Sequence, residues 1–148
     1  FQIPTGRGDI KIVKKFKKIF KFIDESYNAN PLSMSSAIKN ISHYKVKNTS
    51  KKIAFLGDML ELGNKSKKLH KELSKVVNES DLDKVFVYGK HIRETYRHIL
   101  KHKKGKIFNN LIEAHDYFRK FINNNDLLMI KGSNATGLNQ FSKNIKRG

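Results

Sequence analysis

Short apolar runs alternate with amphipathic stretches along most of the chain. Apolar runs of this length, bounded by polar or glycine-containing segments, are typical of β-strands. We predict strands at Ile10–Val13, Phe20–Asp24, Lys52–Leu56, Lys84–Tyr88, Lys106–Phe108 and Asp126–Ile130. In the amphipathic stretches apolar residues recur every three or four positions, which predicts helices. The predicted helices are Pro31–Tyr44, Ser66–Asn78, His91–Lys101, Leu111–Ile122 and Gly137–Ile145.

The order of these elements predicts the fold class. Strands that alternate with helices of 10–15 residues are typical of an α/β domain with a mostly parallel sheet, here of about six strands flanked by helices. In such sheets ligands bind beyond the carboxyl ends of the strands. The loops richest in reactive side chains follow strands, at residues 24–30, 57–63 and 131–134. We therefore expect one binding edge on the sheet.

The first of these loops joins a predicted strand to a predicted helix. It gathers acidic, amide and phenol side chains into the segment Asp24-Glu25-Ser26-Tyr27-Asn28-Ala29-Asn30-Pro31. Asn30 has the right place for a helix N-cap, and Pro31 for the first helical position. A helix N-terminus offers free backbone N–H groups and a positive dipole end, which together favour an anion.

The other two loops each leave two interpretations open. Gly57 lets the chain turn after a buried strand, and Asp58 either accepts from an amine or hydroxyl of a ligand or, with Glu61, caps the next helix. Lys131 and Ser133, on either side of Gly132, either bind a carboxylate or phosphate or form an ordinary turn. Spacing alone does not decide between these readings.

Composition adds a partner class to consider. The formal net charge is +18, which raises the alternative of a nucleic-acid-binding module. The lysines are spread along the chain, however, and no helix-turn-helix, zinc-finger or RNA-recognition signature is present, which favours solvated lysine surfaces. The chain contains no cysteine, which suits a reducing compartment, and no apolar run long enough to span a membrane.

The sequence shows neither a P-loop nor a pattern of metal-binding histidines. Gly57 and the segment Gly63-Asn64-Lys65-Ser66 have the wrong spacing for a phosphate-binding P-loop, and no other P-loop is present. The six histidines show no spacing typical of metal ligands, so we expect no metal site in this chain. Because the chain begins with Phe1 rather than Met, we expect it to be a fragment of a longer protein.

The three loops together resemble those of a known family, the Mur ligases. The segments Ile23–Met34, Leu56–Gly63 and Lys131–Ser133 are similar, in order, to motifs of the C-terminal domain of these enzymes. The residues of the first two motifs are most similar to the corresponding motifs of the members that add D-alanyl-D-alanine. A Mur-type ligase for another amino acid remains the alternative within the family.

The resemblance implies a Rossmann-like C-terminal domain of a three-domain cytoplasmic enzyme. It implies that residues 10–148 form that domain and that residues 1–9 form the hinge from a central ATPase domain. Such enzymes use ATP and Mg²⁺ to join D-alanyl-D-alanine to UDP-N-acetylmuramoyl-tripeptide through an acyl-phosphate. The P-loop and the magnesium ligands lie in the central domain, so the resemblance implies that this chain alone does not catalyse ligation.

The resemblance also implies roles for single residues. Arg7 would reach the ribose or phosphates of ATP from the hinge, and Glu25 would accept from the ribose hydroxyls. Asn28 and Asn30 would line the nucleotide side of the cleft.

On the other side of the cleft, Asp58, Lys131 and Ser133 would hold the amine and carboxylate of the incoming dipeptide. His70 matches a family position to which the resemblance assigns no role.

Overall fold

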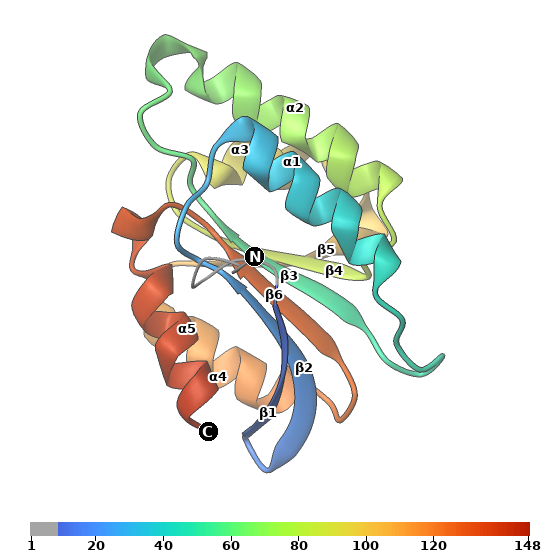
Figure 1. The fold of residues 1–148 in the computed structure, drawn as a ribbon. Coiled ribbons are helices and arrows are strands. Elements are labelled where there is room, and N and C mark those ends of the chain that lie inside the picture. Colours follow the sequence, from blue (N-terminus) through green and yellow to red (C-terminus); the bar gives the residue numbers. More distant parts are fainter. Residues whose placement is uncertain (1–8) are drawn as a thin grey trace, which may run out of the picture.

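The predicted strands and helices form a six-stranded sheet with helices on both faces (Figure 1). The structure, a computed structural model, describes residues 9–148. The strands are β1 Ile10–Lys15, β2 Lys18–Glu25, β3 Lys52–Gly57, β4 Lys84–Tyr88, β5 Lys104–Phe108 and β6 Leu127–Lys131. The helices are α1 Pro31–Asn40, α2 Ser66–Glu79, α3 Ile92–His98, α4 Leu111–Phe121 and α5 Leu138–Arg147.

The strand order in the sheet is β1-β2-β6-β3-β4-β5. β1 and β2 form an antiparallel hairpin, and every other pair of neighbouring strands is parallel. The hairpin turn is made by Phe16 and Lys17, both with positive φ, as in the turns whose twist suits a two-residue hairpin. The prediction of a mostly parallel sheet is confirmed.

The core has two layers because side chains of the buried strands alternate between the two faces of the sheet. In β3, Ala54 and Leu56 belong to an aliphatic layer under α1, α2 and α3. Ile53 and Phe55 belong to the opposite layer, under α4 and α5, which is rich in phenylalanine. All four side chains are fully buried, as predicted for a strand covered on both faces.

The start of α1 confirms the predicted cap. The Asn30 side chain accepts a hydrogen bond from Ser33 N (2.8 Å), and Asn30 N donates to Ser33 Oγ (3.0 Å), so the two residues satisfy each other at the first turn. Pro31 is the first helical residue. The α-helix ends at Asn40, earlier than predicted, and the chain continues as a 3₁₀ turn at Ile41–His43.

α3 is also shorter than its sequence pattern predicts. It ends at His98, because Ile99 is extended and Leu100 N donates to the Asn78 side chain (2.8 Å) on α2. After this bond a 3₁₀ turn at Lys101–Lys103 leads into β5. Ile99 is buried, whereas 46% of Leu100 is exposed.

The chain changes face between β3 and β6, which are neighbours in the sheet. The loop after β3 leads to α2 on one face, and the loop after β6 leads through α5 to the other (Figure 1). The two loops start so close together that a Cβ on Gly132 would lie 3.0 Å from the Gly57 Cα atom. Crevices at such switch points are where α/β sheets bind ligands.

Candidate functional site

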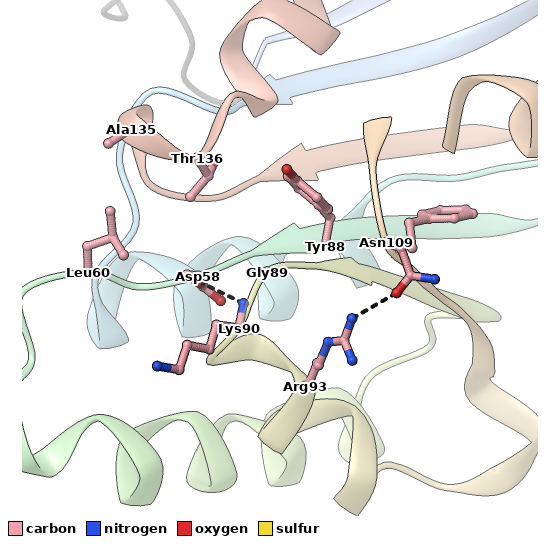
Figure 2. A pocket seen from close by; sticks show the side chains of 10 residues that line it. Asp58, Leu60, Tyr88, Gly89, Lys90, Arg93, Asn109, Ala135 and Thr136 are labelled. Atoms are coloured by element: carbon pink, nitrogen blue, oxygen red, sulfur yellow. Dashed lines mark hydrogen bonds between the residues drawn. The ribbon is translucent and has the colours of Figure 1, made fainter. Parts of the chain in front are cut away.

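A cavity of about 540 Å³ opens at the carboxyl edge of the sheet, beside the switch point (Figure 2). Its walls come from the loops after β3, β4, β5 and β6. It is lined by Asp58, Leu60, Tyr88, Gly89, Lys90, Arg93, Phe108, Asn109, Ala135 and Thr136. The volume lies within the range of about 300–1,000 Å³ that is typical of small-molecule sites. This edge is where the sequence predicted ligand binding.

Asp58 holds two loops of this edge together. Its Oδ1 accepts hydrogen bonds from His91 N (2.8 Å) and Ile92 N (2.7 Å), and its Oδ2 accepts one from Lys90 N (3.1 Å). The carboxylate therefore caps α3, and not α2, the next helix along the chain. Gly89 is required here, since its φ is +142° and a Cβ would lie 2.4 Å from Asp58 Oδ1.

Ser133 joins the loop after β6 to the loop after β3. Its hydroxyl oxygen accepts from Leu60 N (3.1 Å), and its backbone N–H donates to the Asp58 carbonyl (3.0 Å). The two loops are therefore cross-linked on either side of the switch point. That Asp58 and Ser133 also contact a dipeptide stays a prediction.

Lys131 is the last residue of β6 and lies beside Glu25 at the end of β2. Only 4% of the residue is exposed. Its Nζ donates to the Asn28 carbonyl (2.7 Å) and lies 3.4 Å from Glu25 Oε2. The lysine thus connects β6 to the loop after β2. The predicted contact of Lys131 with a dipeptide is not tested by this arrangement.

The loop after β2 is held against α5 by a half-buried acid. Asp24 accepts from Ser26 N (3.0 Å) and from Lys146 Nζ (2.7 Å). Burial of Asp24 favours a raised pKa, but the hydrogen bonds from Lys146 and Ser26 outweigh burial and hold the pKa below its usual range near 3.8. These bonds hold the loop of residues 24–30, the β2 platform, against α5.

The predicted nucleotide-side residues lie on this platform. Glu25 is half-buried beside Lys131, while Asn28 and Asn30 are exposed. None of the three lines the cavity. Arg7 lies outside the described residues. The structure thus separates the predicted residues into a group at the end of β2 and a group beside the cavity.

His70 receives a structural role that the sequence did not supply. The residue is fully buried on α2; its Nε2 accepts from Met59 N (3.1 Å), and its Nδ1 donates to the Ser66 carbonyl (2.8 Å). Burial lowers the pKa of His70 below its usual value of 6.5, although the bond to Ser66 and the charge of Asp58 oppose the shift. A neutral imidazole therefore pins the loop after β3 to α2.

The sequence patterns did not point to the residues on the far wall of the cavity. Arg93, on the first turn of α3, donates from Nη2 to Asn109 Oδ1 (3.1 Å) in the loop after β5 (Figure 2). Lys90 and Tyr88 lie in or next to the loop after β4. A signal was available, because the carboxyl ends of β4 and β5 lie on the same edge as those of β3 and β6.

The described residues offer neither a cluster of metal ligands nor a membrane-spanning helix. Within residues 9–148, no three His, Cys, Asp or Glu side chains come together in a way that could hold a metal ion. None of the helices in that range has the length and apolar character needed to cross a membrane.

Comparison with known families identifies the domain. The family model described as "Mur ligase, glutamate ligase domain" matches residues 10–134. The chain belongs to the Mur ligase family. The motif resemblance is thereby confirmed at the level of the family.

Individual Mur ligases show the same likeness. The chain is 32% identical over 126 residues to the UDP-N-acetylmuramoyl-tripeptide–D-alanyl-D-alanine ligase of Bacillus subtilis (strain 168), covering 83% of this chain and 27% of that protein. The corresponding enzyme of Rickettsia prowazekii (strain Madrid E) is 29% identical over 138 residues, covering 93% of this chain and 29% of that protein. The chain thus spans under a third of the length of these relatives.

Solved Mur ligase structures share the fold. The MurF ligase from Thermotoga maritima in complex with ADP superposes with a TM-score of 0.80 at 22% identity, over 99% of this chain and 32% of that one. A MurF structure from Acinetobacter baumannii gives a TM-score of 0.77 at 24% identity, over 99% and 32% of the two chains. The predicted Rossmann-like Mur ligase fold is confirmed.

Proposed function

We propose that this chain is the C-terminal domain of an ATP-dependent ligase that adds D-alanyl-D-alanine to UDP-N-acetylmuramoyl-tripeptide. The observation that carries the proposal is the likeness, over most of the chain, to relatives that bear this name. The family membership favours a ligase domain over a nucleic-acid-binding module. A cytoplasmic location, which the motif resemblance implies, belongs to the same proposal.

In this proposal residues 10–148 form the C-terminal domain, and residues 1–9 connect it to a central ATPase domain. The sequence contains no P-loop, which supports binding of ATP and Mg²⁺ mainly by that central domain. The Thermotoga maritima MurF ligase is in complex with ADP, which supports a nucleotide in the complete enzyme. This chain alone is then inactive in ligation.

The reaction places two demands on the domain. ATP phosphorylates the tripeptide carboxylate, and the dipeptide amine then attacks the acyl carbon, so that an amide C–N bond forms and phosphate leaves with the electrons of the C–O bond. Catalysis of this kind depends mainly on positioning and on neutralising the phosphoryl charge. The domain must therefore bring the dipeptide to the acyl-phosphate and exclude water.

We assign the nucleotide side to the platform after β2. Arg7, Glu25, Asn28 and Asn30 would contact the nucleotide, with Glu25 accepting from ribose hydroxyls. The ion pair with Lys131 supports this role, because it fixes the Glu25 carboxylate at the edge of the sheet. Asn30 acts mainly through its cap on α1, which sets the path of the loop.

The dipeptide side would lie across the switch point. Asp58, Lys131 and Ser133 shape it, since their polar atoms are engaged in holding the loops after β2, β3, β4 and β6 in place. These contacts support a role in positioning the loops that face the dipeptide.

The proposal is tested with the full-length enzyme that contains this chain. Phosphate release should require ATP, UDP-N-acetylmuramoyl-tripeptide and D-alanyl-D-alanine together. Glu25→Gln should raise the KM for ATP by about 10-fold, the effect of one hydrogen bond to a charged group, with little change in the unfolding midpoint. Glu72→Gln, an exposed acid on α2, is the matched control. Phosphate release at the same rate with and without the dipeptide would refute the proposal.

A further inference from the structure

The cavity at the carboxyl edge contains two basic side chains that the proposed site residues do not explain. Of the described residues in the nucleotide and dipeptide groups, Asp58 alone lines it. Its carboxylate is already satisfied by three backbone N–H groups. The charged groups left to a ligand are therefore those of Lys90 at the rim and Arg93 on the wall.

Arg93 is held in place without being neutralised. No ion pair joins Arg93 or Lys90 to an acid within residues 9–148, whereas Arg97, one turn further along α3, pairs with Glu94 (2.8 Å). One N–H of the Arg93 guanidinium donates to Asn109 Oδ1 (3.1 Å), and the group carries five donors. The Arg93 guanidinium is partly buried, is held by one hydrogen bond and has unused N–H donors. Two of these donors can bind the two oxygens of a carboxylate.

The rest of the cavity limits the ligand further. Leu60, Phe108 and Ala135 add apolar side chains to the lining, and the Thr136 hydroxyl donates to the Ser133 carbonyl. A short ligand with small apolar side groups and a terminal carboxylate fits this lining. Figure 2 shows Arg93 and Asn109 at one side of the cavity, opposite Leu60 and Ala135.

We propose that Arg93, oriented by Asn109, binds the terminal carboxylate of the dipeptide substrate. This rests on the proposed function and moves the carboxylate contact away from Lys131, which is buried against Glu25 and Asn28. With the carboxylate at Arg93, the chain of the dipeptide runs toward the ends of β3 and β6. Its amine then reaches the switch point, beyond which the acyl-phosphate is expected.

The test measures steady-state kinetics of the full-length enzyme for each substrate separately. Arg93→Met should raise the KM for D-alanyl-D-alanine by about 10- to 100-fold, as expected for a lost charge-assisted hydrogen bond. The KM values for ATP and for UDP-N-acetylmuramoyl-tripeptide should change by less than about twofold. Arg97→Met, on the same helix, is the matched control and should leave all three KM values unchanged.

A substrate analogue provides a second readout that does not depend on folding of the variant. D-alanyl-D-alanine amide lacks the carboxylate, so wild-type enzyme should use it about 10- to 100-fold less well than the dipeptide. The Arg93→Met enzyme should lose this discrimination, because both changes remove the same contact. Asn109→Leu should raise the dipeptide KM by a smaller factor with kcat unchanged, as expected of a positioning residue.

Several outcomes would overturn the assignment. An unchanged dipeptide KM in Arg93→Met, or an equal rise in the KM for ATP, would show that Arg93 does not bind this carboxylate. If Arg93→Met does not fold, equal use of the amide and the dipeptide by wild-type enzyme would refute the proposal. If the wild-type enzyme ligates the dipeptide and the Arg93 variants have unchanged KM values, only this contact is refuted. A wild-type enzyme that does not ligate it refutes the proposed function as well.

Discussion

At the scale of the residue, buried polar groups of this domain act through the loops that they hold. His70 is the clearest case, because both ring nitrogens are used and neither faces the cavity. A protonated imidazole could not accept from Met59 N, so the fold requires the neutral form. The stability of the domain should therefore depend on the charge state of this one side chain.

We predict that acidification below pH 6.5 destabilises the domain through His70. The pKa of His70 is lowered in the folded state, so the unfolded chain takes up the proton first and stability falls as the pH drops below 6.5. Above that pH the contribution is complete. Denaturant unfolding from pH 7.5 down to about 5 should show this loss, and His70→Gln should show a flatter profile.

The same pH series distinguishes the contribution of His70 from that of Asp24. Asp24, whose pKa is held below 3.8, loses its contribution only as the pH falls below that value. Parallel pH profiles for wild type and His70→Gln between pH 5 and 7 would contradict the role given to His70.

At the scale of the element, α3 depends on a cap supplied by the loop after β3. Asp58 bonds three successive backbone N–H groups at the start of α3, while Gly89 gives the carboxylate the space it needs. Asp58→Ala should lower the free energy of unfolding by about 2 kcal/mol, the upper end for a helix cap. Asp116→Ala, an exposed acid on α4, should change it by less than about 0.5 kcal/mol.

The cap and the glycine should be coupled. Gly89→Ala should cost about 1–3 kcal/mol in wild type, from its left-handed φ and from the clash with Asp58. In the Asp58→Ala background the clash disappears, so the same substitution should cost less. A double-mutant cycle by denaturant unfolding measures the difference. Strictly additive costs would show that the two residues do not act on one another.

The sequence predicted elements better than it predicted partners. Periodicity located the strands and helices, and Asn30 with Pro31 marked the start of α1, because these signals are local. The end of α3 depends on a bond from Leu100 N to Asn78, across to another helix. The partners of Asp58 come from more than 30 residues further along the chain. Contacts of this kind have no local pattern to reveal them.

The candidate site shows the same limit. Similarity of sequence motifs pointed to the residues after β2, β3 and β6, because several uncommon side chains lie together in each of these motifs. Arg93 is one basic residue among many on amphipathic helices, and the sequence gives no sign that it meets Asn109 beside a cavity. Only the sheet order, with β4 and β5 next to β3, brings these side chains to the binding edge.

At the scale of the whole molecule, the switch point divides the binding edge into two halves. The platform with Glu25 and Lys131 lies on the β2 side, and the cavity with Arg93 lies on the side of β4 and β5. Ser133 and Asp58 connect the loops between them. In the proposed function, the cavity side would hold the dipeptide and the β2 side the nucleotide.

The net charge of +18 gives the last prediction, which separates the ligase domain from a nucleic-acid-binding module. Lysines spread over the surface should attract duplex DNA only weakly and without sequence preference. A gel shift should show binding at about 20 mM salt that is lost by about 150 mM, since the entropy gained by releasing counterions falls as the salt concentration rises. Inorganic polyphosphate should compete as well as unrelated DNA. A discrete complex that survives about 300 mM salt, and that resists polyphosphate, would favour the nucleic-acid module instead.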